Sequence, residues 1–322
     1  MGAVQRDHSR AEVAGDMTRR MICGGLAGCI AKTATNPLER IKMLSQTGEH
    51  GMKETSIVSL YRNILKNEGI SGLWAGNGAN LLRIFPSKAV VFSSNDMYQG
   101  FFRRLLSSMQ GDDSYIHEDP QQRKRLPSTL SFLAGGFAGV SATACTYPLD
   151  FARGRIGGKL GSRTSDGALK KEYRGITHTV LLTVREEGFL ALYKGVTPTL
   201  IGSLPYVGIQ FGTVSLLETL FPSSSFSASP AVRKMIFGGL GGVAAGVITY
   251  PNDTVRRLLQ LQGSRGTTAQ YNGYWDCARK IYRAEGLARF YRGAVINIVR
   301  MAPNSAVQFG SYELLKQWTS NL

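Results

Sequence analysis

The sequence predicts an all-α membrane protein with six transmembrane helices in three pseudo-threefold tandem repeats, each repeat carrying one additional short helix. Three observations lead to this fold class. A proline motif with a fixed charge pattern occurs three times, a glutamate-glycine motif follows each copy, and each repeat contains two long apolar segments. Motifs that recur at a fixed period indicate that one structural unit is repeated along the chain.

The proline motif places an acidic residue two positions after proline and a basic residue five positions after it. Its copies begin at Pro37, Pro148 and Pro251, which divide the 322 residues into three units of similar length. In a helix, the three-residue step from acid to base puts both on one face, and proline removes a backbone hydrogen bond and can bend the segment. A bent helix that carries an acid and a base is a candidate gate element.

The second motif has two parts. It begins with Glu-Gly, and five positions after that glycine come an aromatic residue, one further residue and a second glycine. Its copies are Glu68-Gly69 with Trp74-Ala75-Gly76, Glu187-Gly188 with Tyr193-Lys194-Gly195, and Glu285-Gly286 with Tyr291-Arg292-Gly293. Because all three copies keep step with the proline motifs, the chain is a tandem triplication.

The apolar segments predict helices at 19–45, 76–106, 128–157, 195–220, 231–261 and 290–318. Each reaches the roughly twenty residues that cross a bilayer, although charged residues interrupt several of them. We therefore divide the chain into a disordered N-terminal tail at 1–16, repeat 1 at 17–110, a polar inter-repeat loop at 111–127, repeat 2 at 128–222 and repeat 3 at 223–322.

The formal net charge of +16 would be compatible with nucleic-acid binding if the protein were soluble. The basic residues are instead spread over motifs and loops, without an aromatic-rich basic face. We therefore expect no nucleic-acid partner. Attraction to anionic lipid and to a phosphate-bearing substrate accounts for the charge.

The polar residue types give no indication of catalysis or of a metal site. The four cysteines lack a Cys-x-x-Cys spacing and the four histidines do not cluster with them, so neither a metal centre nor a disulfide scaffold is expected. No nucleophile stands next to a base in a recognisable spacing. We expect a protein that is not an enzyme and that uses no cofactor.

Three basic residues, Lys32, Arg83 and Arg300, fall inside predicted membrane spans. An unpaired cation in the membrane interior is costly, so such residues usually face water or an anionic partner. Three of them in one cavity indicate an anionic, phosphate-bearing substrate, which arginine binds well through its planar set of donors. The alternative is that these side chains extend to the membrane surface or pair with carboxylates.

Over about residues 17–320, these motifs resemble those of the mitochondrial carrier family. The resemblance implies a multi-pass protein of the mitochondrial inner membrane, a six-helix bundle with a central substrate site, and two gates that open alternately. It also implies that the short helices lie on the matrix side, that both termini face the intermembrane space, and that cardiolipin binds at helix junctions near the glycine motifs. We expect a monomer.

The resemblance assigns gate positions residue by residue. The matrix gate is Glu39 and Lys42, Asp150 and Arg153, and Asp253 and Arg256, each acid being expected to pair with a base of another repeat. Gln46 and Gln260 match the bracing glutamines, whereas Gly157 stands at the third brace position.

The family's cytoplasmic gate motif is intact only in repeat 3, at Tyr312, Glu313 and Lys316. We expect one link, between Lys316 and Asp96, and hence a cytoplasmic gate weaker than the matrix gate. The alternative is that these are exposed helix-end charges without a gating role, since surface ion pairs usually contribute under about 1 kcal/mol.

Gly202, Ser203 and Tyr206 match the positions at which adenine-nucleotide carriers hold the base. A glycine admits a flat ring close to the backbone, and tyrosine offers a face for stacking. Lys32 and Arg83 match phosphate-contacting positions of the ADP/ATP carriers. The alternative is that the trio only packs helices ahead of Pro205.

The chain departs from the ADP/ATP carriers after the third motif. Those carriers show three arginines followed by three methionines, whereas this chain reads Arg256-Arg257-Leu258-Leu259. Its flanking segments look more like the subgroup that carries coenzyme A, or ATP-Mg against phosphate. The N-terminal residues contain no EF-hand loop, which weakens a calcium-regulated ATP-Mg/phosphate carrier.

We therefore predict an antiporter of an adenine-containing phosphate compound, either coenzyme A or an adenine nucleotide, that works by alternating access. Its substrate would meet Lys32, Arg83, Arg257 and Arg300. Two alternatives stay open at this stage: an ATP-Mg/phosphate carrier, and a carrier-like fold that acts as a proton or anion leak of the uncoupling type.

Overall fold

The computed structural model describes residues 2–48, 56–111, 113–116, 126–160, 162–163, 169–170, 173–221, 230–263 and 270–320. Within them lie the long helical segments α1 (Gly2–Thr47), α3 (Asn77–Gln110), α4 (Ser128–Gly158), α6 (Val196–Leu220), α7 (Pro230–Ile248) with α8 (Tyr250–Leu261), and α10 (Ala294–Ser320). The short helices are α2 (Ile57–Glu68), α5 (Ile176–Glu187) and α9 (Tyr274–Glu285). This is the architecture that the sequence predicts, with two long segments and one short helix in each repeat.

The remaining elements are small. The 3₁₀ turns η1 (Ile70–Trp74), η3 (Phe189–Tyr193) and η5 (Leu287–Tyr291) join each short helix to the next long one, and η2 (Asp113–Tyr115) follows α3. The two-residue strands β1 (Ser162–Arg163) and β2 (Leu169–Lys170) pair antiparallel. They do not alter the all-α class.

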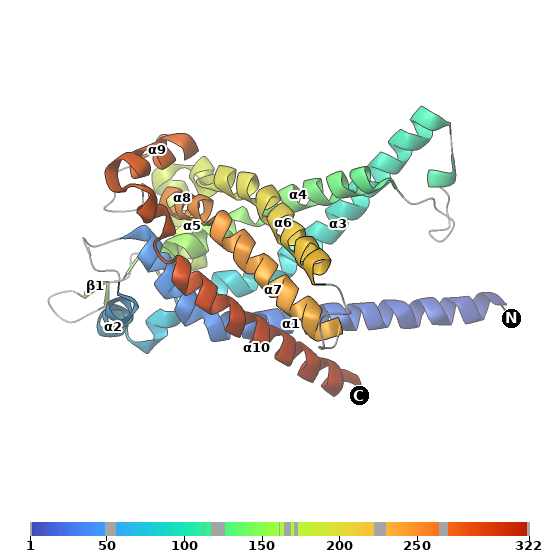
Figure 1. The fold of residues 1–322 in the computed structure, drawn as a ribbon, viewed down its shortest axis with the longest axis horizontal. Coiled ribbons are helices and arrows are strands. Elements are labelled where there is room, and N and C mark those ends of the chain that lie inside the picture. The colour runs from blue at the N-terminus through green and yellow to red at the C-terminus, as the bar shows by residue number, and fades with distance from the viewer. Residues whose placement is uncertain are drawn as a thin grey trace.

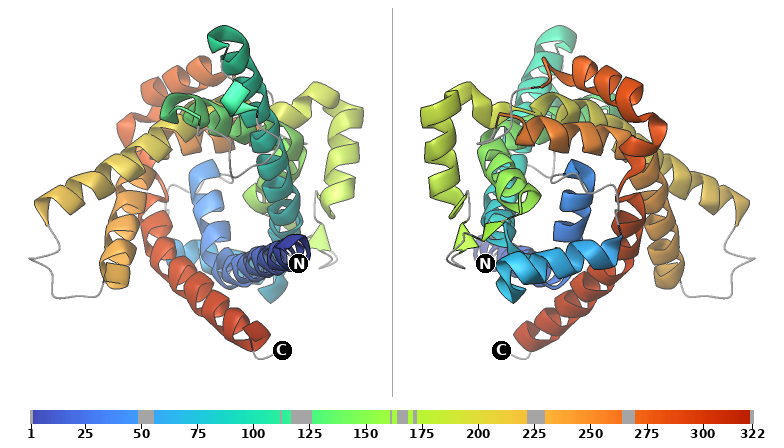
Figure 2. Two further views of the ribbon diagram at one scale, coloured as in Figure 1. Left: turned by 90° about the vertical axis from the view of Figure 1, so that its right-hand side faces the viewer. Right: turned by 90° about the vertical axis from the view of Figure 1, so that its left-hand side faces the viewer.

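The long helices stand in a ring, which Figure 2 shows from both ends. α1 packs beside α10, α3 beside α4, and α6 beside α7, so neighbours in the ring come from consecutive repeats or from the two ends of the chain. In Figure 1 the short helices α2, α5 and α9 gather at one end of the bundle, and both termini lie toward the other. The motif-bearing helices α1, α4 and α8 also contact one another.

Helix interruption differs between the repeats. Pro37 and Pro148 lie inside continuous helices, whereas in repeat 3 the helix expected over 231–261 breaks at Thr249 between α7 and α8. Proline lacks a backbone donor in all three motifs, so it does not by itself distinguish repeat 3, where the break is a local tightening of the chain. The chain tightens there, because the Asn252 amide nitrogen donates to the Thr249 carbonyl at 3.1 Å.

The structure differs from the prediction at the N-terminal end of the chain. Residues 2–16, predicted to be a disordered tail, continue α1 as helix to Gly2. The segment is polar but contains no proline, and its alanines, arginines, glutamine and glutamate favour helix, so it can extend a helix that is already formed downstream.

The outward faces of the long helices carry large exposed apolar side chains. Examples from different helices are Leu26, Phe92, Phe132, Leu204, Leu240 and Val299. Exposed apolar surface on this scale marks a surface that contacts lipid or another protein, and it agrees with the predicted membrane spans. Of the described helical stretches, 128–158 and 189–220 have the length and hydropathy of a membrane span on composition alone, and Met235–Ile248 is a shorter apolar helix.

Buried apolar side chains concentrate at the end where the short helices lie. Each repeat contributes one cluster there: Ile41, Leu44, Leu60, Ile64 and Leu73 with Ile296; Tyr147, Phe151 and Leu192; and Val255, Leu259, Cys277, Ile281 and Phe290. This packed end fixes the positions of the three proline motifs, and hence of the charged residues that they carry.

Candidate functional site

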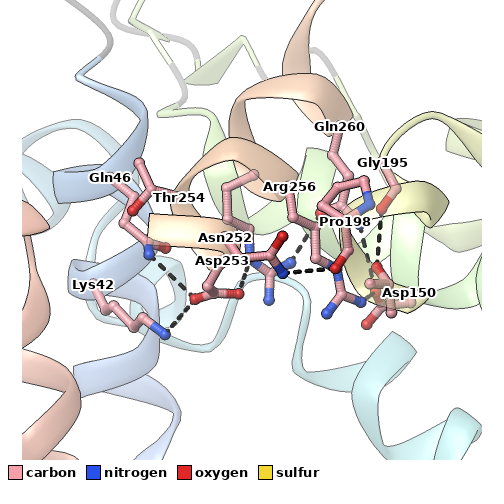
Figure 3. Close-up of polar contacts among 12 residues, drawn as sticks. Lys42, Gln46, Asp150, Gly195, Pro198, Asn252, Asp253, Thr254, Arg256 and Gln260 are labelled. Carbon is pink, nitrogen blue, oxygen red and sulfur yellow. Dashed lines mark hydrogen bonds and ion pairs between the residues drawn. The ribbon is translucent and has the colours of Figure 1, made fainter. Parts of the chain in front are cut away.

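The six charged residues of the proline motifs form a closed ring, called the charged ring below. Arg153 Nη2 lies 2.5 Å from Glu39 Oε1, and Lys42 Nζ lies 2.8 Å from Asp253 Oδ2. The third pair joins Arg256 to Asp150. Every pair links two different repeats, as the resemblance implies, and Figure 3 shows two of the three pairs.

Two glutamines brace the charged ring. Gln46 Nε2 donates to Asp253 Oδ2 at 3.2 Å, and Gln260 Nε2 donates to Asp150 Oδ2 at 3.4 Å. The pair between repeats 1 and 2 has no such brace, because Gly157 occupies the equivalent position. A Cβ atom at Gly157 would lie 2.6 Å from the Met43 methyl group, so the space is already filled.

The charged ring is largely shielded from water. The exposed fractions of the Asp150 and Arg153 side chains are 5% and 7%, respectively. Removing one member of a buried ion pair leaves an uncompensated charge, which costs about 3–5 kcal/mol. Separating one of these pairs is therefore costly unless another group compensates its charges.

Residues just before the motif prolines also support the closure, and the sequence analysis did not single them out. The Tyr147 hydroxyl donates to the Lys194 carbonyl at 3.0 Å, and the Tyr250 hydroxyl donates to the Arg292 carbonyl at 2.9 Å. The Tyr147 hydroxyl also accepts from Gln260 at 3.2 Å. The available signal was that an aromatic residue precedes two of the three prolines.

Three further arginines tie neighbouring repeats together near the short helices. Each pairs with the glutamate of its own Glu-Gly motif: Arg40 with Glu68, Arg155 with Glu187, and Arg289 with Glu285. Each also donates to backbone carbonyls near the end of a helix from another repeat. Arg40 donates to the carbonyls of Ile156 and Lys159, Arg155 to those of Gln260 and Gln262, and Arg289 to that of Thr47. These contacts satisfy carbonyls that a helix end leaves without a partner.

The Glu187 carboxylate lies in this second set of contacts, outside the membrane-spanning segments. It forms ion pairs with Arg155 and with Lys194, whose Nζ lies 2.6 Å from Glu187 Oε2. Burial disfavours its charge, yet the hydrogen bonds from Arg155 and Lys194 hold the pKa of Glu187 below the usual glutamate value. Glu187 is therefore a charged anchor at neutral pH.

A cavity of about 390 Å³ lies against the charged ring, and we call it the Tyr206 cavity. It falls within the size range of small-molecule sites. Of the residues singled out from the sequence, those that line it are Lys42, Gly202, Ser203, Tyr206, Asp253, Arg256 and Arg300. The structure thus brings the expected base-binding trio, one expected substrate cation and half of the charged ring into one space.

The cations Lys32 and Arg83 lie beside the charged ring, although they are not part of the described lining of the Tyr206 cavity. Glu39, Arg300 and Arg83 are all close enough to act electrostatically on Lys32. Asp150, Arg153 and Arg256 of the charged ring likewise act electrostatically on Arg83. All three expected substrate cations therefore share one electrostatic neighbourhood.

Two of these arginines have unused donors. The Nε atoms of Arg83 and Arg300 are buried without a hydrogen-bond partner among the described residues, while Arg300 Nη2 donates to Asn297 Oδ1 at 3.2 Å. A buried donor without a partner is costly, and an anionic ligand would remove that cost.

Two expected residues play a different part from the one predicted. Arg257 Nη1 donates to Gln260 Oε1 at 3.0 Å and its Nε lies 4.0 Å from Asp253 Oδ1, so in this state it supports the charged ring instead of lining the cavity. The space beside Gly202, expected to admit a flat ring, is occupied by the Asn252 amide group. The sequence reasoning missed this because Asn252 comes from another repeat.

The expected cytoplasmic link is not formed. Asp96 lines one cavity with Gln99 and Arg103, and Glu313 and Lys316 line another. In the part of the chain that the structure describes, no ion pair joins Asp96 to Lys316, and the Lys316 carbonyl accepts from Arg19 at 3.2 Å. The bundle is therefore closed by charge pairs at the end with the short helices, and no such pair joins Asp96 and Lys316 at the opposite end.

Comparison with known proteins gives one consistent result. A family model described as "Mitochondrial carrier protein" matches residues 14–105, 124–225 and 227–321. The chain is 33% identical to the "Mitochondrial adenine nucleotide transporter ADNT1" of Arabidopsis thaliana, over 92% of this chain and 86% of that protein. It is 31% identical to the "Mitochondrial carrier protein CoAc1" of Zea mays, over 98% of this chain and 91% of that protein. It is also 32% identical to the "ADP,ATP carrier protein" of Parachlorella kessleri, over 89% of this chain and 81% of that protein.

Proposed function

This chain belongs to the mitochondrial carrier family, and from that premise we propose that it exchanges an adenine-containing phosphate compound across the membrane by alternating access. As a member of the family it is a multi-pass protein of the mitochondrial inner membrane and a transporter of small molecules, not an enzyme. The substrate and the exchange mode are what we propose here.

One observation carries the proposal: the Tyr206 cavity joins an aromatic ring to a set of cations at the charged ring. Tyr206 offers a face on which a base can stack. Arg300 and Arg256 line the same space, and the Nε of Arg83, which lies outside the lining, is buried without a hydrogen-bond partner among the described residues. A molecule with a flat base and several phosphates matches both halves of this arrangement.

The relatives support an adenine compound. Two of those compared are named for adenine nucleotides, the Arabidopsis transporter and the Parachlorella carrier. Coenzyme A contains a 3′-phosphorylated ADP unit, so it would use the same aromatic ring and the same cations. Both substrates therefore stay within the proposal.

The charged ring gives the proposed transport cycle its coupling step. A phosphate group that approaches Arg256 or Lys42 competes with Asp150 and Asp253 for the same cations. A ligand shifts an equilibrium between two states only by its differential affinity for them. The substrate would thus compensate the charges that separate as the ring opens, and without it the ring stays closed.

We also propose cardiolipin as a lipid partner of the monomer. A cavity of about 400 Å³ lies between repeats 1 and 2, lined by Trp74, Gly76, Lys159, Arg174 and Gly175 among others. The helices α3 and α5 begin beside this cavity, so their first backbone amides are available to an anionic headgroup, and the cations add to the attraction.

Ligand-dependent thermal unfolding of the purified protein in mild detergent tests the substrate. The panel is coenzyme A, dephospho-coenzyme A, adenosine 3′,5′-bisphosphate, ADP, ATP, AMP, ATP-Mg, phosphate and dicarboxylates. A ligand that binds the folded state raises the melting temperature, and we expect only adenine compounds to do so strongly. A shift with coenzyme A and adenosine 3′,5′-bisphosphate, but little with ATP, assigns coenzyme A. A shift with ADP or ATP assigns a nucleotide, and stabilisation by dicarboxylates alone contradicts the proposal.

A further inference from the structure

Asn252 breaks the threefold pattern of the proline motifs. The residue that follows the motif proline is leucine in repeats 1 and 2, at Leu38 and Leu149, but asparagine in repeat 3. Residues that serve the shared fold are expected in every repeat, whereas a bound molecule has no threefold symmetry. A polar residue at one of three equivalent positions is therefore a candidate for ligand recognition, provided that it reaches a ligand site.

Asn252 does reach such a site, because it lines the Tyr206 cavity. Its Nδ2 donates to the Pro198 carbonyl at 2.6 Å, a contact drawn in Figure 3. A carbonyl only accepts hydrogen bonds, so the amide nitrogen must face Pro198, and the orientation of the side-chain amide is fixed. The oxygen Oδ1 is then left as an acceptor, buried and without a partner among the described residues.

Packing holds this amide in place. The Asn252 Nδ2 fills the space beside Gly202, where a Cβ atom would overlap it. Glycine at position 202 is thus needed for the close approach of the amide, and the hydrogen bond to Pro198 resists rotation of the side chain. A buried acceptor held rigidly without a partner is costly to the protein alone, and a ligand that donates to it gains more than it would in water.

Several neutral polar side chains of the cavity lining are already engaged. The hydroxyls of Ser203, Thr199 and Thr249 donate to carbonyls of their own helices at 2.8, 2.9 and 2.7 Å. The other asparagine in the lining, Asn297, accepts from Arg300 at 3.2 Å. Among the described lining residues, Asn252 Oδ1 is a buried acceptor without a partner, whereas the other unpartnered buried atoms, Arg256 Nε and Arg300 Nε, are donors.

Resting on the proposed function, we propose that Asn252 Oδ1 accepts a hydrogen bond from the 6-amino group of adenine and so selects adenine over purines that carry oxygen at C6. The 6-amino group is a donor, whereas the 6-oxygen of guanine or hypoxanthine is an acceptor. An oxygen facing Oδ1 would leave two buried acceptors without a donor. Sites built around one buried hydrogen bond reject the analogue that lacks it for this reason.

The test compares binding of ADP and of its hypoxanthine counterpart, inosine diphosphate, which differ at C6. Purified wild-type protein, Asn252→Leu and Asn252→Ala are titrated with each nucleotide, with the melting temperature of the unliganded variants as the check of folding. We expect the wild type to bind ADP about tenfold more tightly than inosine diphosphate. Asn252→Leu, which restores the residue of the other two repeats, should bring the two affinities within about twofold, mainly by weakening ADP.

Asn297→Leu is the matched control, because it removes the amide whose oxygen is already used by Arg300. Asn297→Leu should weaken the binding of both nucleotides equally and leave the ratio of the two affinities unchanged. If wild-type protein binds ADP and inosine diphosphate equally, or if folded Asn252→Leu and Asn252→Ala both keep the wild-type ratio, the role of Asn252 is wrong while the proposed function stands. If no adenine compound binds the wild type, the proposed function itself fails, and the role of Asn252 fails with it.

Discussion

We expect Arg83→Ala to abolish measurable exchange of an adenine-containing substrate, while the purified variant keeps a melting temperature close to that of the wild type. Arg83 lies beside the charged ring, and its Nε is buried without a partner among the described residues. Truncating a buried charge that pairs with a ligand typically costs about 2–5 kcal/mol, which corresponds to roughly 30-fold or more in affinity. Folding is spared because alanine at this position does not leave a buried acceptor without its donor.

The measurement is uptake of labelled substrate into liposomes that contain the purified variant. Arg104→Ala is a matched control, since Arg104 lies on the same helix α3 but lines the cavity near Asp96, and it should exchange at a near-normal rate. Arg83→Lys should recover only part of the activity, because lysine keeps the charge but not the planar set of donors. Normal exchange by Arg83→Ala would remove Arg83 from the substrate site.

Exchanging the charges of Glu39 and Arg153 gives the second large effect. Each single change, Glu39→Arg or Arg153→Glu, places two like charges together in a buried pair and should abolish exchange. The double variant restores one acid and one base at 39 and 153, so a measurable fraction of exchange should return. This pair is the most suitable of the three, because Gly157 leaves it without a glutamine brace and the ion pair alone joins these two side chains.

Exchange by each variant is measured with the same uptake assay, and the melting temperature of each variant is the check of folding. A double variant that folds but exchanges no better than either single variant would show that 39 and 153 do not act as a pair. Contacts other than the Glu39–Arg153 pair would then close the bundle between repeats 1 and 2. Recovery in the double variant is difficult to explain by any role of either residue alone.

The repeats and the charged ring could be predicted because the information is local in the sequence. Each proline motif carries its acid and base within six residues, and each short helix precedes a Glu-Gly motif that marks its end. The spacing alone placed Glu39 and Lys42 on one helix face, but the observed partner of Glu39 is Arg153 of the next repeat. The partner came from the family resemblance, since the spacing of residues does not show which helices become neighbours.

Contacts between distant segments account for what the sequence did not show. Gly202 could be read as room for a base, because nothing near it in the sequence indicates that Asn252 fills that space. The carbonyl contacts of Arg40 and Arg155 likewise join residues more than a hundred positions apart. The continuation of α1 to Gly2 was missed for a different reason, since polarity was taken as disorder although the residue types favour helix.

The most direct test of the central claim is uptake of labelled ADP or coenzyme A into liposomes that contain the purified protein, with and without an adenine compound inside. If an anionic substrate must compensate the charges of Lys42, Arg153 and Arg256 each time the ring opens, uptake occurs only when internal substrate is present for the return step. Equal uptake into empty liposomes, or proton conductance without any substrate, would contradict coupled exchange and would instead identify a leak that opens without its substrate.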